Sequence, residues 1–77
     1  MDRYLLRYFL AVAELGSFSK AAARVSVTQP TLSVGIAKLE AELGQPVFDR
    51  RSKDVALTDA GQLLQSRAEQ ILALVGD

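Results

Sequence analysis

The 77-residue chain contains no cysteine, no histidine and no tryptophan. Without cysteine it can form no disulfide, thiolate zinc site or cysteine nucleophile. Without histidine it lacks the commonest general base and metal ligand, and every Ser–His triad. Chemistry would depend on scattered carboxylates: Glu40 and Glu42, for example, lie two residues apart on a predicted helix and do not face each other. We therefore expect a protein that is not an enzyme and that holds no metal and no cofactor.

Long hydrophobic runs and an excess of one charge are also absent. Nine basic residues balance nine acidic ones, so the net charge of zero indicates no particular partner. The apolar stretch from Tyr8 to Ala13 is shorter than a signal-peptide core or a membrane span, and an amphipathic core helix accounts for it better. A hydrophobic content of 49% in so short a chain predicts one small folded domain. We expect a cytoplasmic protein with no membrane segment.

Three helices are predicted in the first half of the chain. Residues 3–15 contain no glycine or proline and carry apolar side chains at helical spacing, and Gly16 follows as a helix stop. Residues 17–25 predict a short second helix, with Ser19 as its N-cap and Phe18 as the preceding apolar residue. Thr28 is expected to cap a third helix that ends at Gly44. Its inner face would consist of Leu32, Ile36, Leu39 and Leu43.

A short hairpin and a final helix are expected to follow. Residues 46–50 and 54–57 are the candidate strands, and the polar segment 51–53 would form their tip. Thr58 is a predicted N-cap, and Asp59 suits the positive end of a helix that runs to the end of the chain. This helix has more apolar surface than its own domain can cover. One predicted stripe comprises Ala60, Leu64, Ala68, Ile71 and Val75, and off it lie Leu63, Leu72 and Leu74.

Two short helices joined by a tight link, the second beginning Thr-Gln-Pro, are typical of a helix-turn-helix. The outward positions of the third helix carry groups that can meet base edges in a major groove: Gln29, Thr31, Ser33, Val34 and Lys38. Basic residues also gather on the elements proposed to bind, because residues 17–39 hold three basic side chains and no acid. The predicted hairpin tip adds Arg50, Arg51 and Lys53, with Asp49 and Asp54 as flanking acids. An ordinary solvated helix face and a solvated hairpin turn are the competing interpretations of the helix and of this tip.

The chain resembles the N-terminal DNA-binding domain of LysR-type transcriptional regulators over essentially its whole length. The ordered elements that carry the resemblance are 9–14 with 16–18, Ala21-Ala22, 27–30, Leu32-Ser33, Ile36, Leu39-Glu40, Leu43-Gly44, Phe48, Arg50, Leu57-Thr58 and Ala60-Gly61. The resemblance implies a mainly α fold: a winged helix-turn-helix of three helices and a short two-stranded wing, followed by a long linker helix. The implied domains are 1–58 for DNA binding and 59–77 for the start of the linker and dimerisation helix.

The resemblance also implies sequence-specific binding of double-stranded DNA, with recognition helix 28–43 in the major groove and wing 46–57 on the backbone or minor groove. Thr28 and Thr31 would contact phosphate, whereas Gln29, Pro30, Ser33 and Val34 would face bases. The implied DNA-contacting residues are Ser19, Lys20, Thr28, Gln29, Pro30, Thr31, Ser33, Val34, Lys38, Arg50, Arg51, Ser52 and Lys53. The implied homodimer interface comprises Leu6, Leu10, Leu63, Leu64, Ile71, Leu72, Leu74 and Val75.

Two positions depart from the family pattern. Val34 stands where relatives often have Arg or Gln, and Gly35 stands where they often have Gln. Fewer side chains of this helix can therefore hydrogen-bond to bases. Gly35 would lie close either to DNA or to a neighbouring helix. Family members carry a C-terminal domain that binds a small-molecule effector and can form tetramers; that domain is absent from these residues. A winged-helix module that contacts protein rather than DNA is the alternative function, supported by the balanced charge.

Overall fold

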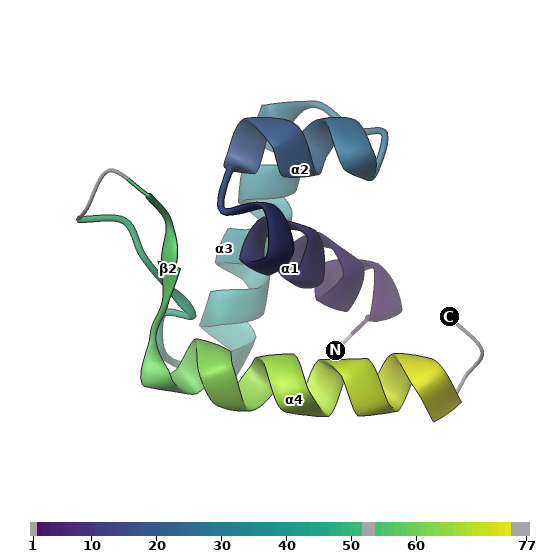
Figure 1. Ribbon diagram of the computed structural model, residues 1–77, viewed down its shortest axis with the longest axis vertical. Coiled ribbons are helices and arrows are strands. Elements are labelled where there is room, and N and C mark those ends of the chain that lie inside the picture. The colour runs from purple at the N-terminus through teal and green to yellow at the C-terminus, as the bar shows by residue number, and fades with distance from the viewer. Residues whose placement is uncertain (1, 52–53, 75–77) are drawn as a thin grey trace.

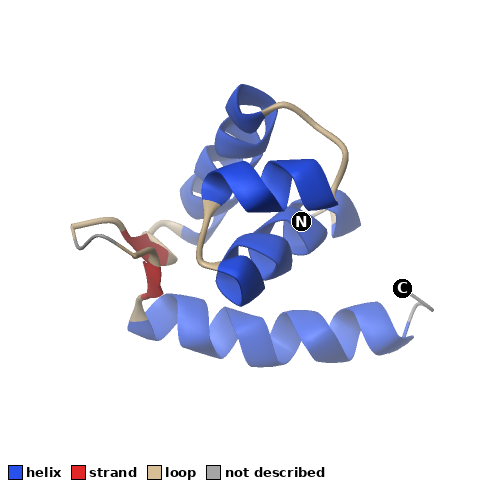
Figure 2. Ribbon diagram, turned by 45° about the horizontal axis from the view of Figure 1, so that its top comes forward, coloured by secondary structure: helices blue, strands red, loops and turns tan. Residues whose placement is uncertain are grey.

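The computed structural model describes residues 2–51 and 54–74, and it confirms the mainly α winged fold. In chain order the elements are α1 (Arg3–Leu15), α2 (Phe18–Arg24), α3 (Gln29–Leu43), β1 (Phe48–Asp49), β2 (Ala56–Leu57) and α4 (Asp59–Leu74). The first three helices pack on one another, and α4 runs beneath them along α1 (Figure 1). The hairpin projects from one side of the molecule and rises away from α4 (Figures 1 and 2).

The ends of α1 and α3 lie where the local signals predict them. Gly16 adopts a left-handed conformation with φ of 64°, and its N–H donates to the Val12 carbonyl at 2.8 Å. Thr28 caps α3, because its Oγ1 accepts the Thr31 N–H at 3.2 Å. Gly44 ends α3 with φ of 76°. These boundaries depend on bonds within a few residues of chain, which explains why they are readable from sequence.

The predicted cap of α2 is wrong, because Ser17 rather than Ser19 occupies that position. The Ser17 Oγ accepts the Lys20 N–H at 3.1 Å, and Phe18 is already helical. Gly16 turns the chain, and Ser17 follows with an extended backbone, so the helix begins two residues earlier than expected. The earlier start also gives the Phe18 ring a packing partner, since it meets the Phe48 ring edge-on at 5.8 Å between centroids.

The turn between α2 and α3 is built around Ser26, which has a positive φ of 62°. The Ser26 N–H donates to the Ala23 carbonyl at 3.3 Å, and the Val27 N–H donates to the Ala22 carbonyl at 3.0 Å. This pair of bonds is the Schellman arrangement, in which glycine usually occupies the left-handed position. Here a serine adopts it, so the tight link of the helix-turn-helix contains a strained non-glycine residue.

The main core lies between α1, α2, α3 and the base of the hairpin. Its completely buried side chains are Leu5, Phe9, Val12, Ala21, Leu32, Ile36, Leu39 and Val47. This confirms the predicted inner face of α3 except at Leu43, which is only half-buried at the end of the helix. The Phe48 ring lies against Phe9 at 5.2 Å between centroids, so the hairpin is joined to the helical core by aromatic packing.

The hairpin strands are shorter than predicted. Phe48 pairs with Leu57 and Asp49 with Ala56 in an antiparallel ladder. At its base the Val47 N–H donates to Glu40 Oε2 of α3 at 2.8 Å, and the Thr58 hydroxyl donates to the Pro46 carbonyl at 2.8 Å. Polar bonds from α3 and Thr58 thus replace the outer ladder pairs of the expected longer strands.

The Thr58 cap of α4 is confirmed, since its Oγ1 accepts the Gly61 N–H at 3.0 Å. The structure buries Ala68 of the predicted α4 stripe but not Ile71, and it buries Leu72, which the pattern placed off that stripe. Ala68 and Leu72 are buried against Leu6 of α1, whereas Ile71 remains 43% exposed. The helix is turned so that the smaller Ala68 and the following Leu72 meet α1, which leaves Ile71 on the rim.

Candidate nucleic-acid interface

The outer face of α3 presents the predicted base-reading side chains to solvent. Val34 is 70% exposed, and Ser33 is half-buried. The other exposed residues of this face are Thr28, Gln29, Pro30, Thr31 and Lys38. The structure therefore leaves each of these side chains at least partly accessible to solvent.

Two threonines at the start of α3 are hydrogen-bonded to each other. The Thr28 hydroxyl donates to Thr31 Oγ1 at 3.0 Å and also accepts the Thr31 N–H. A hydroxyl has one proton to donate. One of the two hydroxyl protons is therefore used within the chain, and the pair keeps the other for an acceptor outside the protein.

Gly35 is buried, and the structure places it against a neighbouring helix. A Cβ at this position would lie 2.7 Å from Cδ2 and 2.9 Å from Cε2 of the Tyr8 ring. The close approach of α1 to α3 thus depends on the missing side chain. Gly35 accordingly lies on the α1 side of α3, away from the exposed face that carries Val34.

Basic side chains of α2 also lie at the surface. Ser19 and Lys20 are exposed at the start of the helix. At its other end, Arg24 forms an exposed ion pair with Glu14 of α1, with 3.0 Å between Nη1 and Oε2. The acid-free segment 17–39 is therefore paired with an acid of α1. The two residues are ten positions apart, and nothing in the sequence predicted that they would meet.

Each of the wing arginines is held by a specific contact. The Arg50 guanidinium lies over the Phe18 ring, 4.2 Å from its centroid, and so links the wing to α2. Arg51 forms two side-chain bonds to Asp49, from Nε to Oδ1 at 2.9 Å and from Nη2 to Oδ2 at 2.6 Å. These bonds lower the pKa of Asp49 to about 2. Ser52 and Lys53, also assigned to the wing, lie outside the described residues.

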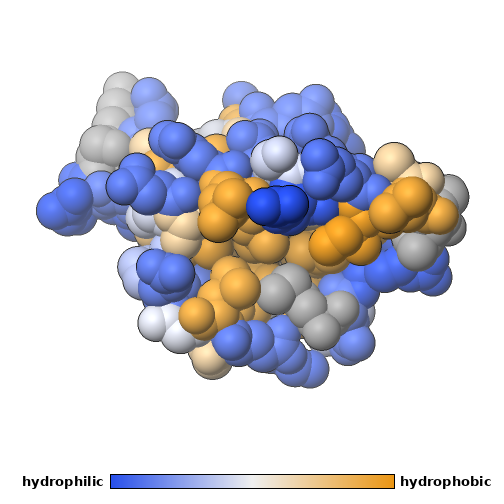
Figure 3. Space-filling model, turned by 90° about the horizontal axis from the view of Figure 1, so that it is seen from below, coloured by the Kyte–Doolittle hydropathy of each residue, from blue (hydrophilic) through white to orange (hydrophobic). Residues whose placement is uncertain are grey.

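The residues assigned to the dimer interface fall into two groups. Leu6 and Leu72 are buried against each other within this chain, so they have little area left for a partner. Leu10 and Leu64 are half-buried, and Val75 lies outside the described residues. Leu63, Ile71 and Leu74 are 61%, 43% and 87% exposed. Viewed from the side of α4, apolar side chains gather along this face (Figure 3).

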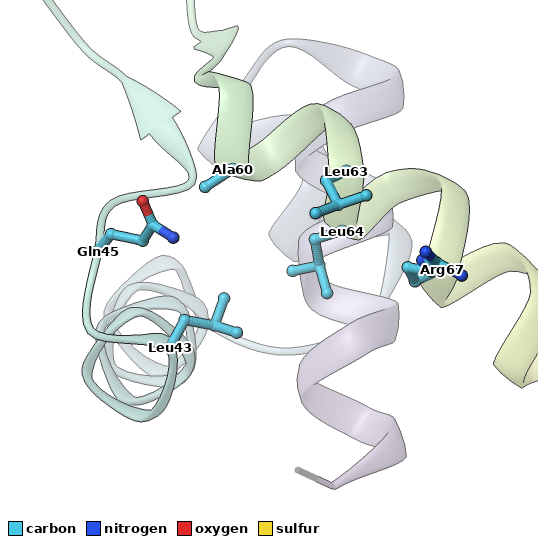
Figure 4. A pocket seen from close by; sticks show the side chains of 6 residues that line it. All are labelled: Leu43, Gln45, Ala60, Leu63, Leu64 and Arg67. Carbon is cyan, nitrogen blue, oxygen red and sulfur yellow. The ribbon is translucent and has the colours of Figure 1, made fainter.

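An apolar groove continues this surface toward the end of α3. It has a volume of 220 Å³ and is lined by Leu43, Gln45, Ala60, Leu63, Leu64 and Arg67 (Figure 4). Among the described residues there is no cluster of three acidic side chains placed to hold a metal ion. No helix in residues 2–51 and 54–74 is both long and apolar enough to cross a bilayer.

A helix-turn-helix with an adjoining two-stranded wing defines the class of this fold. Residues 4–62 match the family model described as the bacterial regulatory helix-turn-helix protein, lysR family, and the chain belongs to that family of transcriptional regulators. It is 49% identical over 71 residues to the HTH-type transcriptional regulator XapR of Escherichia coli (strain K12). This alignment covers 92% of the chain and 24% of XapR. An uncharacterized regulator of Azotobacter vinelandii is 48% identical over 77 residues, covering 100% of the chain and 54% of that relative.

Solved structures of the family superpose closely on this chain. The BenM DBD/benA site 1 DNA complex has a TM-score of 0.94 at 41% identity and covers 99% of this chain and 85% of that one. The CbnR DBD–DNA complex has a TM-score of 0.93 at 39% identity, with coverages of 99% and 87%. The chain thus spans nearly all of these DNA-binding domains but only a quarter to a half of the two curated relatives named above.

Proposed function

We propose that this chain is the sequence-specific DNA-binding module of a bacterial transcription regulator, acting in the cytoplasm and without enzymatic activity. The observation that carries the proposal is the exposed outer face of α3, where Gln29, Thr31 and Val34 stand clear of the core. A helix of this kind fits the major groove, and its polar and methyl groups match base edges. That similar chains are solved as complexes with DNA supports the same role here.

The proposal divides the module at the Thr58 cap. Residues 1–58 would bind DNA, and the helix that follows would pair with its counterpart in a homodimer through Leu63, Ile71 and Leu74. In the whole regulator, a further domain would bind a small-molecule effector, and dimers could join as tetramers. The DNA-binding module itself would need no cofactor.

We assign different roles to neighbouring residues of α3. Gln29 can form a bidentate pair with adenine, which discriminates against other bases by about 1–3 kcal/mol. Ser33 lies four residues further on the same helix face and is less selective, because a hydroxyl can donate or accept. Thr31, exposed in the first turn of α3, would donate to a phosphate and so strengthen binding to every sequence alike.

The test is in vitro selection of duplex DNA by the purified chain, followed by a binding series over all four bases at each half-site position. Gln29→Ala should relax the preference at one base pair per half-site and leave non-specific binding nearly unchanged. Thr31→Ala is the matched variant, and it should weaken all sequences about equally. A uniform loss of affinity in Gln29→Ala with unchanged preferences would contradict the assignment. No salt-dependent binding to any duplex would favour the protein-contact alternative.

We also propose that Val34 recognises a base through an apolar contact. An isopropyl group that is 70% exposed on this face fits the methyl of thymine, which the major groove displays. Replacing thymine by uracil one position at a time removes only that methyl. One such replacement should weaken binding of the wild-type protein and leave Val34→Ala unaffected. Equal losses for both proteins at every position would exclude this contact.

A further inference from the structure

Asp49 and Arg51 are joined by several hydrogen bonds at the end of β1. One carboxylate accepts three hydrogen bonds from one residue: the Arg51 backbone N–H at 3.0 Å, Nε–H at 2.9 Å and Nη2–H at 2.6 Å. The Asp49 side chain is only 32% exposed, whereas that of Arg51 is 90% exposed. The carboxylate is thus the anchored partner, and the guanidinium is the one that reaches into solvent.

The bonds to Asp49 occupy only one edge of the guanidinium. Arginine has five side-chain N–H donors in a fixed plane, and two of them face the carboxylate. The remaining three belong to Nη1 and Nη2, and one from each nitrogen points outward in parallel from the Nη1–Nη2 edge. Two parallel N–H groups on one edge match a pair of acceptor oxygens, as in a phosphate.

We propose that Asp49 is a positioning residue, which holds Arg51 so that its outer Nη1–Nη2 edge binds a DNA phosphate bidentately. The inference rests on the proposed function and assigns a role to an acidic residue of the wing. Arginine side chains lose considerable rotamer freedom when they bind. Asp49 removes much of that freedom before DNA arrives, and Arg50, stacked on Phe18, is fixed beside it.

The proposal and a simple charge argument predict opposite effects of removing Asp49 on DNA affinity, so the two can be tested against each other. Removing an acid near DNA should strengthen binding, because like charges repel. Removing the anchor of Arg51 should weaken it. Asp49→Ala is therefore expected to bind a random-sequence duplex several-fold more weakly than wild type, with a salt slope about one unit shallower, as for Arg51→Ala. In the Arg51→Ala background only the charge effect remains, so Asp49→Ala should strengthen binding there.

Two controls separate positioning from charge and from misfolding. Asp59→Ala removes an equal, exposed charge two residues after β2 and should strengthen binding in both backgrounds. The Arg51 Nε–H resonance in the free protein should exchange faster in Asp49→Ala while the remaining amide spectrum stays folded. Asp49→Asn, which keeps one acceptor oxygen, should bind DNA with intermediate affinity.

The outcomes distinguish this inference from the proposed function. If wild type binds no duplex, both fail. If wild type binds but Asp49→Ala strengthens binding in both backgrounds, as Asp59→Ala does, Asp49 acts only as a charge and the positioning role is overturned. An Arg51→Ala variant with an unchanged salt slope would overturn it equally, because there would be no phosphate contact to position.

Discussion

Gly61 in the first turn of α4 lies directly against the carbonyl oxygen of Val47, where a Cβ would overlap that oxygen. The same carbonyl accepts the Thr58 N–H at 3.1 Å. The backbone before β1 and the start of α4 are therefore in contact without an intervening side chain. This contact sets the position of α4 relative to the wing and explains why position 61 is a glycine.

Gly61→Ala should lower the free energy of unfolding by about 1–3 kcal/mol, because the added methyl forces the backbone of Val47 or of α4 to move. Urea denaturation followed by circular dichroism measures the change. Gln62→Ala is the control, since Gln62 is exposed and its truncation should stay within about 0.5 kcal/mol of wild type. Equal stability of the two variants would show that this contact is easily relaxed.

Gly35→Ala should destabilise the wild-type protein but stabilise a variant that lacks the Tyr8 ring. In wild type the new Cβ would lie 2.7 Å from Tyr8 Cδ2, which offsets the gain in helix propensity. In the Tyr8→Ala background the ring contact is gone, and the gain of about 1 kcal/mol is opposed only by Leu5 Cδ2, the end of a flexible side chain, 3.3 Å from the new Cβ. A double-mutant cycle of unfolding free energies measures both signs. The same sign in both backgrounds would mean that the ring moves aside without cost.

Ser26→Gly should stabilise the protein by about 1 kcal/mol. Glycine adopts the left-handed conformation without the Cβ penalty, and this gain exceeds the entropy it adds to the unfolded chain. Ser66→Gly in the exposed part of α4 makes the same chemical change at a helical position and should cost about 0.5 kcal/mol. Thermal unfolding of the two variants is the comparison. A loss of stability in Ser26→Gly would show that the serine is not strained in the turn.

The carboxyl of Asp49 should titrate with a pKa of about 2 in the folded protein, because Arg51 donates side-chain and backbone hydrogen bonds to it. The lowered pKa stabilises the folded state at pH values above the ordinary 3.8, and this contribution disappears as the pH falls from 3.8 through about 2. Carboxyl carbon shifts in NMR report the titration, and Arg51→Ala should return the pKa toward 3.8. A carboxyl that titrates near 3.8 in wild type would mean that the pair is open in solution.

The exposed leucines of α4 should support a dimer. Burial of each leucine side chain contributes roughly 1.5–3 kcal/mol, so Leu63→Glu with Leu74→Glu should convert a sedimenting dimer into a monomer. Gln62→Glu with Ala73→Glu adds the same two charges to the adjacent face of the helix and should leave association intact. A wild-type chain that is monomeric at micromolar concentration would contradict the assignment.

The sequence alone determined the features that arise from nearby residues. The limits of α1 and α3, the Thr58 cap and the inward Leu32, Ile36 and Leu39 follow from caps, glycine stops and helical spacing, each of which acts within a few residues. The family could be read for a related reason, since its ordered motifs combine such local signals. The exposed face of α3 then follows, because the side chains left over from the core point outward.

Only the tertiary structure decided the features that depend on distant segments. Whether Ile71 or Leu72 is buried depends on the rotation of α4 against Leu6, which no periodicity within α4 specifies. The place of Gly35 required knowing where α1 crosses α3. The paired hydrogen bonds between Asp49 and Arg51 could not be predicted without knowing how the chain bends as it leaves β1. In each case the stabilising free energy comes from a contact between two groups, and the packing of whole helices and strands sets the distance between them. The sequence of a single helix or strand does not specify that packing.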